Sequence, residues 1–310
     1  MAAKRILLIA NPASGQHRGE RRLAQASERL ASLGHAVTAT LTESAGHATR
    51  LAKSNAPDFE IIAALGGDGT VNEVANGLMA VEPGERPTLA TLPVGTGNDV
   101  ALTYGLAHFE SAIDALAKGS TRTLDVIRVQ LMRDGKSVTR HALLFVAAGF
   151  AAEVIRKTGP RVKRIFGRRF SYSVGLFRAL ASFRAPEFSV KWDGGERSGR
   201  MFQVCAGNTE FAAGGVMRIS PGARPDDGLL NISLVDVLGR LQIVRRFPSI
   251  LSGRYVEDER VDYFTGKRLE IDAVPPAELQ ADGDIIGTTP ATIELLPGTL
   301  KLVVHDQFQV

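Results

Sequence analysis

The sequence of 310 residues contains one cysteine, and its six histidines are scattered. Cys205 has no partner for a disulfide, and no cysteines or histidines have the spacing of a zinc site. This scarcity excludes a disulfide-rich fold and a structural or catalytic zinc centre. It also favours a reducing compartment, so we expect a cytoplasmic protein.

Long hydrophobic runs are missing too. The longest uncharged apolar run, residues 142–152, is shorter than the about 20 residues that a membrane-spanning helix needs. Residues 1–5 lead directly into a strand-like segment without the cleavage pattern of a signal peptide. We therefore expect membrane contact, where it occurs, to be peripheral and at the inner face.

Two common nucleotide motifs are absent as well. No G-x-x-x-x-G-K-[ST] occurs, and no G-x-G-x-x-G follows the first expected strand. The chain has instead 32 glycines, and the most prominent cluster lies at residues 66–69. It follows the apolar run 61–65, which is typical of a buried parallel strand.

The cluster at residues 66–69 contains three glycines and Asp68, and a helix is predicted from Thr70. Unpaired N–H groups and the positive dipole end of that helix favour an anion at the turn. We interpret the turn as a site for nucleotide phosphates, with Asp68 available to Mg²⁺. The alternative is an ordinary tight turn between a strand and a helix.

Length and pattern predict two domains, because single cores rarely exceed about 250–300 residues. In residues 1–124, strands and helices alternate, which is typical of a parallel sheet covered by helices. Glycine turns at residues 11–15, 66–69 and 93–99 each follow an expected strand. Ligands of such sheets bind beyond the carboxyl ends of the strands, so we expect the three turns to converge.

From residue 125 to residue 310 the pattern changes to short strands. An Asp-Gly turn at residues 134–135 predicts a hairpin. Two separate strands, 292–296 and 300–304, are expected near the end. This part predicts an antiparallel β-sandwich or barrel, with a last strand or tail that can return to the first domain.

Three motifs occur in order: Asn11-Pro12-x-Ser14-Gly15, Gly66-Gly67-Asp68-Gly69-Thr70 and Pro93-x-Gly95-Thr96-x-Asn98-Asp99. In this combination the chain resembles the diacylglycerol kinase and sphingosine kinase catalytic-domain family, and within it the bacterial YegS-type lipid kinases. The second motif alone is shared with NAD kinases and resembles a phosphofructokinase motif. The resemblance covers nearly the whole chain and implies an NAD kinase/phosphofructokinase-like α/β domain followed by a β-rich lipid-substrate domain.

The resemblance implies transfer of the γ-phosphate of ATP to a lipid hydroxyl, diacylglycerol-like or phosphatidylglycerol-like, with Mg²⁺. The nucleotide would lie between the domains, and Asp68 would help to hold the catalytic Mg²⁺. The positions that match the family's nucleotide contacts are Asn11, Pro12, Ser14, Gly15, Thr42, Gly66, Gly67, Asp68, Gly69, Thr70, Asn72 and Thr96.

The family's Asp-Gly-Glu motif reads Asp282-Gly283-Asp284 here. The resemblance implies a base for the lipid hydroxyl, and we expect Asp282 to be that base or a magnesium ligand. Asp284 keeps the charge of the usual Glu but is one methylene shorter, so its reach is reduced if it transfers the proton. The alternatives are an Asp-Gly turn between strands and a non-catalytic, lipid-binding or regulatory homologue.

A second metal site is implied by the resemblance of residues 221–230 to another family motif. The ligands would be the carbonyls of Arg224 and Leu229 and the carboxylate of Asp227. Such an all-oxygen site suits Mg²⁺ or Ca²⁺. Without the family, the segment is an Asp-rich turn before a strand.

Residues 154–186 hold nine Lys or Arg and no Asp or Glu. Arg164, Arg168 and Arg169, interleaved with apolar residues, suit an anionic membrane surface. No recognition motif accompanies this charge, so a nucleic acid partner is not expected. A solvated helix face is the alternative. For the activity, the alternative is a kinase for a soluble acceptor such as NAD; the particular lipid and the oligomeric state do not follow from the sequence.

Overall fold

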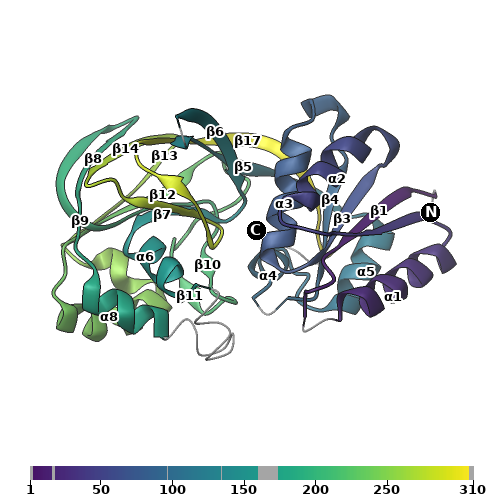
Figure 1. The fold of residues 1–310 in the computed structure, drawn as a ribbon, viewed down its shortest axis with the longest axis horizontal. Helices are drawn as coiled ribbons and strands as arrows, with labels where there is room; N and C mark the ends of the chain where they lie inside the picture. Colours follow the sequence, from purple (N-terminus) through teal and green to yellow (C-terminus); the bar gives the residue numbers. More distant parts are fainter. Residues whose placement is uncertain (1–2, 16–17, 96, 134, 160–173, 307–310) are drawn as a thin grey trace.

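A computed structural model of the chain describes residues 3–15, 18–95, 97–133, 135–159 and 174–306. The chain forms two lobes that lie side by side (Figure 1). The N-terminal lobe contains β1 (Arg5–Ala10), α1 (Gly19–Ser32), β2 (Ala36–Leu41), α2 (His47–Asn55), β3 (Ile61–Gly66), α3 (Asp68–Met79), β4 (Thr88–Pro93), α4 (Asp99–Thr103) and α5 (Phe109–Lys118).

The sheet of the N-terminal lobe is parallel, in the order β4-β3-β1-β2. Helices cover both faces, so the expected α/β architecture is confirmed. Neighbouring side chains of β3 point to opposite faces of the sheet. Ile62 packs in the cluster that contains Val74 and Leu78 of α3. Ile61 packs in the cluster that contains Leu30 of α1. The unbroken apolar run of β3 follows from this double coverage.

The C-terminal lobe is built from antiparallel strands with a few helices at one end (Figure 1). As expected, it is sandwich-like. Its elements are β5 (Thr121–Arg133), β6 (Lys136–Ala142), β7 (Phe145–Gly149), α6 (Phe150–Lys157), a helical segment at residues 174–182, β8 (Glu187–Trp192), β9 (Gly195–Gly207), β10 (Phe211–Ala212), β11 (Met217–Arg218), β12 (Leu230–Asp236), α8 (Arg240–Ser252), β13 (Val261–Gly266), β14 (Arg268–Val274), β15 (Glu278–Ala281), β16 (Asp284–Thr288) and β17 (Ala291–Val303).

The two strands expected near the end of the chain are parts of one long strand, β17. Its pairing with β5 shifts register between Leu296 and Leu300, and Gly298 has a φ of +55° in this interruption. Near its end, Leu302 pairs in parallel with Leu89 of β4. The sheets of the two lobes are therefore continuous through β17.

The expected domain boundary after residue 124 falls inside β5, which pairs with β17 on both sides of that point. Among the described residues, none of the helices combines the length and the apolar character that a bilayer crossing requires.

Candidate active site

The three glycine turns meet at the carboxyl edge of the parallel sheet. The N–H groups of Val94 and Gly95 donate to the Gly66 carbonyl, at 2.9 and 3.2 Å. The N–H of Asn11 donates to the Leu65 carbonyl at 3.1 Å. A Cβ added to Gly95 would lie 2.6 Å from the Cα of Gly67, so only glycine fits at this contact. The convergence that the sequence predicts is therefore present.

The first turn is folded back on itself after β1. Asn11 Oδ1 accepts from the N–H of Ala13 at 3.0 Å, and the N–H of Ser14 donates to the Asn11 carbonyl at 3.0 Å; Pro12 lies within the same turn. Gly15 has a φ of +60°, and a Cβ there would overlap the Val94 carbonyl. The turn therefore packs against the one that follows β4.

Thr42 directly follows β2, and its N–H donates to the carbonyl of Ala10 at 2.8 Å. This bond places the residue beside the first turn, at the same sheet edge. Thr96, in the third turn, lies outside the described residues.

The second turn leads into α3 without a side-chain cap. Gly67 is the N-cap residue, and the helix begins at Asp68, two residues before the predicted start at Thr70. The N–H of Thr70 donates to the Gly67 carbonyl at 2.9 Å, whereas the N–H groups of Asp68 and Gly69 have no acceptor within the helix by their position. Apart from its own helix and chain neighbours, the one described atom that a Cβ on Gly69 would meet within 4 Å is Oδ2 of Asp284, at 3.8 Å. The Cα of Gly69 therefore faces open space that is bordered by Asp284.

Asp68 joins the second turn to the third. Its Oδ1 accepts from the N–H of Val100, in the first turn of α4, at 3.0 Å. Its Oδ2 lies 3.1 Å from the position of a Cβ on Gly97. The carboxylate thus bridges the second and third turns, and its Oδ2 lies where it can meet a cation or a phosphate-bound metal.

Asp99 and Asn98 are site residues that we did not assign from the sequence. Asp99 Oδ1 accepts from the N–H groups of Gly214 and Gly215, in the turn between β10 and β11, at 2.6 and 3.2 Å. Burial and the nearby charge of Asp68 raise the pKa of Asp99. Its place as the last residue of the third motif was the only signal in the sequence.

Asn98 presents an acceptor beside the third turn. Its Nδ2 donates to the Gly95 carbonyl at 2.9 Å. Its Oδ1 is buried and has no hydrogen-bond partner among the described residues. A buried amide oxygen in this position fits a hydroxyl or amino donor of a bound nucleotide, because buried polar atoms are nearly always hydrogen-bonded.

Asp282 is enclosed by donors rather than facing the glycine turn. Its Oδ1 accepts from the N–H groups of Leu144 and Phe145, both at 3.0 Å, and its Oδ2 from the N–H of Leu143 at 2.7 Å. The same Oδ2 accepts from Asn72 Nδ2 at 3.1 Å. Burial raises the pKa of Asp282 to about 6, and these hydrogen bonds oppose that rise. All four donors hold the carboxylate in one orientation.

Asn72, expected at the nucleotide, directs its amide to the C-terminal lobe. Besides Asp282, its Nδ2 donates to the carbonyl of His141 at 3.2 Å. Asn76, one helical turn further along α3, donates to the same carbonyl at 3.0 Å and accepts from the N–H of His141 at 2.9 Å. One face of α3 is thus hydrogen-bonded to the second lobe.

Asp284, the first residue of β16, is exposed at the other side of the Asp-Gly turn. Of the two acidic residues in this motif, it is the one that lies next to Gly69. The short turn therefore separates a half-buried carboxylate with four donors from one that borders the open space.

The expected second metal site has few preorganised ligands. Asp227 is exposed, and its Oδ1 accepts from the N–H of Leu229 at 2.9 Å. The buried Asp125 accepts from the N–H of Gly228 at 2.7 Å, which fixes the turn without a metal. The Arg224 guanidinium lies 3.6 Å from Asp226. Within the described part of the chain, no group of three or more His, Cys, Asp or Glu is arranged to hold a metal.

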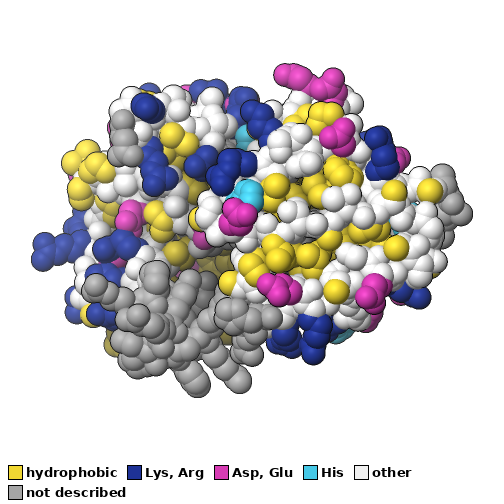
Figure 2. All heavy atoms as spheres, turned by 45° about the vertical axis from the view of Figure 1, so that its right-hand side comes forward, with side chains coloured by type: hydrophobic (Ala, Val, Ile, Leu, Met, Phe, Trp, Pro, Cys, Tyr) yellow, Lys and Arg dark blue, Asp and Glu magenta, His cyan; other side chains and the backbone are white. Residues whose placement is uncertain are grey.

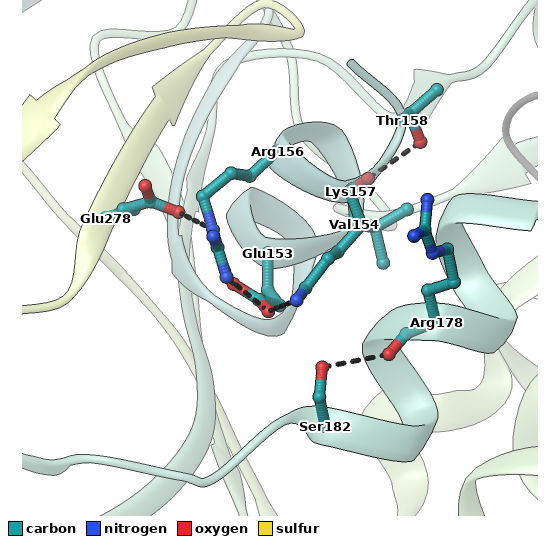
Figure 3. Close-up of polar contacts among 8 residues, drawn as sticks. All are labelled: Glu153, Val154, Arg156, Lys157, Thr158, Arg178, Ser182 and Glu278. Carbon is teal, nitrogen blue, oxygen red and sulfur yellow. Dashed lines mark hydrogen bonds and ion pairs between the residues drawn. The ribbon is translucent and has the colours of Figure 1, made fainter. Parts of the chain in front are cut away.

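Of the basic segment 154–186, the structure describes residues 154–159 and 174–186. Arg156 pairs with Glu153 at 2.6 Å and with Glu278 at 3.0 Å, and Lys157 lies 3.6 Å from Glu153 (Figure 3). Arg164, Arg168 and Arg169 lie outside the described residues. Arg156 and Lys157 are therefore engaged by acids of α6 and β15 and are poorly placed to meet lipid headgroups.

Two family models match the chain and together span most of it. Residues 5–129 match the diacylglycerol kinase catalytic domain. Residues 144–304 match the YegS C-terminal NAD kinase beta sandwich-like domain.

Individual proteins are similar over nearly the full length. A diacylglycerol kinase of Bacillus subtilis (strain 168) is 28% identical over 292 residues, which cover 93% of this chain and 92% of that protein. One of Staphylococcus aureus (strain bovine RF122 / ET3-1) is 28% identical over 290 residues, covering 93% and 88%. A solved structure described as a diacylglycerol kinase from Bacillus anthracis str. Sterne superposes with a TM-score of 0.75 at 25% identity and covers 99% of this chain and 98% of that one.

Proposed function

Because the chain belongs to the family of the diacylglycerol kinase catalytic domain with the YegS-type C-terminal domain, and is therefore a kinase that phosphorylates an alcohol group of a lipid, we propose that it transfers the γ-phosphate of ATP to a diacylglycerol-like acceptor with the help of Mg²⁺. The observation that carries this proposal is the open space at Gly69, at the N-terminus of α3 and bordered by Asp284.

In this proposal, the phosphates of ATP lie over the three glycine turns. The N–H groups of Asp68 and Gly69, at the start of α3, donate to phosphate oxygens, and the helix adds the positive end of its dipole. Ser14, Gly15 and Thr42 line the neighbouring part of the sheet edge. Asn98 Oδ1, buried without a partner among the described residues, accepts from the nucleotide.

The residues present fit a magnesium ion that is held jointly with ATP. Mg²⁺ in nucleotide sites is commonly bound by one or two carboxylates and the substrate phosphates, which agrees with the lack of a protein-only cluster among the described residues. Asp68 would supply the carboxylate through Oδ2, since its Oδ1 accepts from Val100. When bound, the ion neutralises charge on the transferring phosphate.

We assign the proton transfer to Asp284 rather than to Asp282. A general base needs a carboxylate oxygen within reach of the substrate hydroxyl, and Asp284 borders the open space. As the acceptor oxygen bonds to the γ-phosphorus, its proton passes to Asp284 and the bond to the β-phosphate oxygen breaks, releasing ADP. Asp282, with four donors on its oxygens, holds the turn that positions Asp284.

At Asp227 we propose a structural cation that also contacts the carbonyls of Arg224 and Leu229. The fit is partial, because one carboxylate oxygen already accepts from the N–H of Leu229. Replacing Asp227 by Ala should lower the Mg²⁺ or Ca²⁺ content of the purified protein and its melting temperature. If neither value changes, the segment is only a turn held by Asp125.

The test of the main proposal is transfer of labelled γ-phosphate from ATP to dioleoylglycerol in detergent micelles, with and without Mg²⁺. We compare wild type, Asp68→Asn and the control Asp114→Asn, whose carboxylate is exposed beside Arg29 in the same lobe. Label should enter the organic phase with wild type and the control, and Asp68→Asn should reduce it at least about 100-fold. Label only in a soluble acceptor such as NAD, or in no product, would refute the lipid kinase assignment.

A further inference from the structure

Helix α8 carries an exposed apolar stripe that nothing in the described structure covers. No residue of α8 is fully buried. Leu241 and Val244 are 62% and 55% exposed, and Leu251 is 38% exposed; Pro248 is exposed as well. The spacing of these four residues, three, four and three, places them on one side of an α-helix.

Two arginines flank the apolar stripe. At 100° per residue, Arg240 falls at one edge of it and Arg245 at the other. Residues 240–252 include three arginines and no acidic residue. Arg246, on the inner side, is paired with Asp258 at 2.8 Å, whereas Arg240 donates to the carbonyl of Ala181 and Arg245 forms no ion pair among the described residues. The outward charge is thus positive and not neutralised by neighbouring acids.

The neighbouring helical segment, residues 174–182, extends the same surface. It is tied to α8 by the bond from Arg240 to Ala181 and by the shared cluster that contains Leu180 and Ile243. Its Phe177 is 67% exposed, and Arg178, drawn in Figure 3, is exposed as well. The two helices lie together at the lower end of the C-terminal lobe in Figure 1.

This surface adjoins the candidate active site. Helix α8 ends at Gly253, where an added Cβ would lie 2.8 Å from both Arg218 and Pro221. Arg218 belongs to β11, and the turn between β10 and β11 is held by Asp99 of α4. One short hairpin therefore separates α8 from the glycine turns.

We infer that the outward faces of α8 and of residues 174–182 dock on an anionic lipid bilayer. An apolar stripe between cationic edges fits the boundary between acyl chains and negative headgroups, where arginine heads reach the phosphates and apolar side chains enter the acyl region. The choice of a lipid surface rests on the proposed lipid kinase function. Figure 2 likewise shows Lys and Arg side chains beside hydrophobic ones over the C-terminal lobe, at the left of that view.

The proposal differs from the expectation drawn from the basic stretch. Arg156 and Lys157 of that stretch are paired with acids, so the proposed docking surface draws its cations from α8 and residues 174–184 instead. Membrane binding should accordingly depend on α8 and be insensitive to exposed groups on the far strands of the same lobe.

The experiment is flotation of the full chain with vesicles of phosphatidylglycerol and phosphatidylcholine in equal amounts. The first variant combines Leu241→Gln with Val244→Gln. It should lower the partition coefficient at least about tenfold, because two apolar side chains can no longer enter the acyl region of the bilayer. Arg245→Glu should lower it about tenfold at low salt, with a smaller effect at high salt. Matched controls are Met132→Gln, 51% exposed on β5, and Arg133→Glu beside it.

Melting temperatures and transfer to micellar dioleoylglycerol are measured for every variant. They should match wild type, because none of these residues touches the proposed substrates. If the double variant fails to fold, the vesicle binding of Arg245→Glu alone tests the docking surface. Unchanged vesicle binding in the α8 variants, equal loss in the controls, or no binding of wild type to anionic vesicles would overturn the docking surface. Failure of phosphate transfer with intact, α8-dependent vesicle binding would instead refute only the proposed function.

Discussion

The amide of Asn72 and the carboxylate of Asp282 are 3.1 Å apart, although 210 residues separate them in the sequence. Asn72 lies on the helix that follows the central glycine turn, and Asp282 lies in the turn before β16. Their hydrogen bond ties the proposed phosphate site to the strand that begins with Asp284. The position of the proposed base relative to ATP thus depends on a buried polar contact between the lobes.

Replacing Asp282 by Asn should destabilise the fold by about 2–4 kcal/mol. Each carboxylate oxygen accepts from two N–H donors. In the Asn variant, the side-chain NH₂ replaces one of these oxygens and faces two N–H donors without an acceptor. Urea denaturation measures the change. Asp193→Asn is the control, since that exposed carboxylate also accepts two N–H groups, at Lys267 and Arg268, and should cost less than about 1 kcal/mol. Equal effects of the two substitutions would show that burial of Asp282 does not matter.

The stability contributed by Asp282 should depend on pH. Burial raises the pKa of Asp282 from 3.8 to about 6 in the folded chain. Between these values the folded state binds a proton that the unfolded state has lost, so the free energy of unfolding falls as pH rises, by on the order of 2–3 kcal/mol in all. The contribution is fully present below about pH 4 and is lost as pH passes through about 6.

Denaturation of wild type and Asp282→Asn at several pH values between about 4 and 7 isolates this group, because other titrations cancel in the difference. The stability advantage of wild type over the variant should shrink as pH rises. A difference that stays constant across the range would mean that the carboxyl group keeps its ordinary pKa.

Gly95→Ala should disrupt the contact between the second and third turns. The new Cβ would lie 2.6 Å from Gly67 Cα, a backbone atom that cannot move away freely. We expect a loss of about 1–3 kcal/mol and a raised KM for ATP. Gly84→Ala is the matched control, because a Cβ there meets nothing within 4 Å. Normal ATP kinetics in Gly95→Ala would separate this contact from nucleotide binding.

Asp284→Asn should lower kcat by about 100-fold or more, which is the usual contribution of a general base. Asp284→Glu keeps the carboxylate with a longer reach and should retain activity within about tenfold of wild type. Steady-state kinetics with saturating ATP and micellar dioleoylglycerol provide the measurement, with Asp272→Asn, an exposed acid of β14, as the control. Full activity of Asp284→Asn would exclude it as the base; a large rise with Asp284→Glu would mean that the native side chain is too short.

Asp99→Ala should loosen the turn between β10 and β11, because it removes the acceptor for Gly214 and Gly215. Amide hydrogen exchange over residues 211–218 should become faster, with a cost in stability of about 1–2 kcal/mol. Asp99→Asn retains an Oδ1 acceptor and should restore most of the protection. If Asn behaves like Ala, the charge of Asp99 rather than its hydrogen bonds is what matters.

The local features of the N-terminal lobe were predictable because each depends on neighbouring residues. The apolar run 61–65 followed by Gly66 and Gly67 encodes a buried strand and an open turn within ten residues. Parallel pairing then brings the carboxyl ends together, so convergence of the three turns followed from the strand order. Only the start of α3 differed, since Asp68 already has helical geometry.

Features that depend on distant pairing were not predictable. Nothing near Asp282 indicates that the backbone at residues 143–145 will surround it. The β17 segment contains Pro297 and Gly298, which ordinarily separate strands, yet β5 pairs with it on both sides of the interruption. Helix α8 was not predicted because apolar residues occur on both of its sides: Ile243 packs against a core cluster, whereas Leu241 and Val244 face solvent. Pro248 lies inside the helix and obscures the pattern further.

The path of β17 limits the order in which the two lobes can fold. Leu300 and Leu302 of this strand belong to the same core cluster as Ile62 and Val74, and Leu302 pairs with β4. During synthesis the N-terminal lobe emerges first, yet its sheet lacks this edge and part of its core until residues 291–303 have left the ribosome. The N-terminal lobe therefore cannot finish folding before the C-terminal lobe has been made, and the two must reach the native state as one cooperative unit.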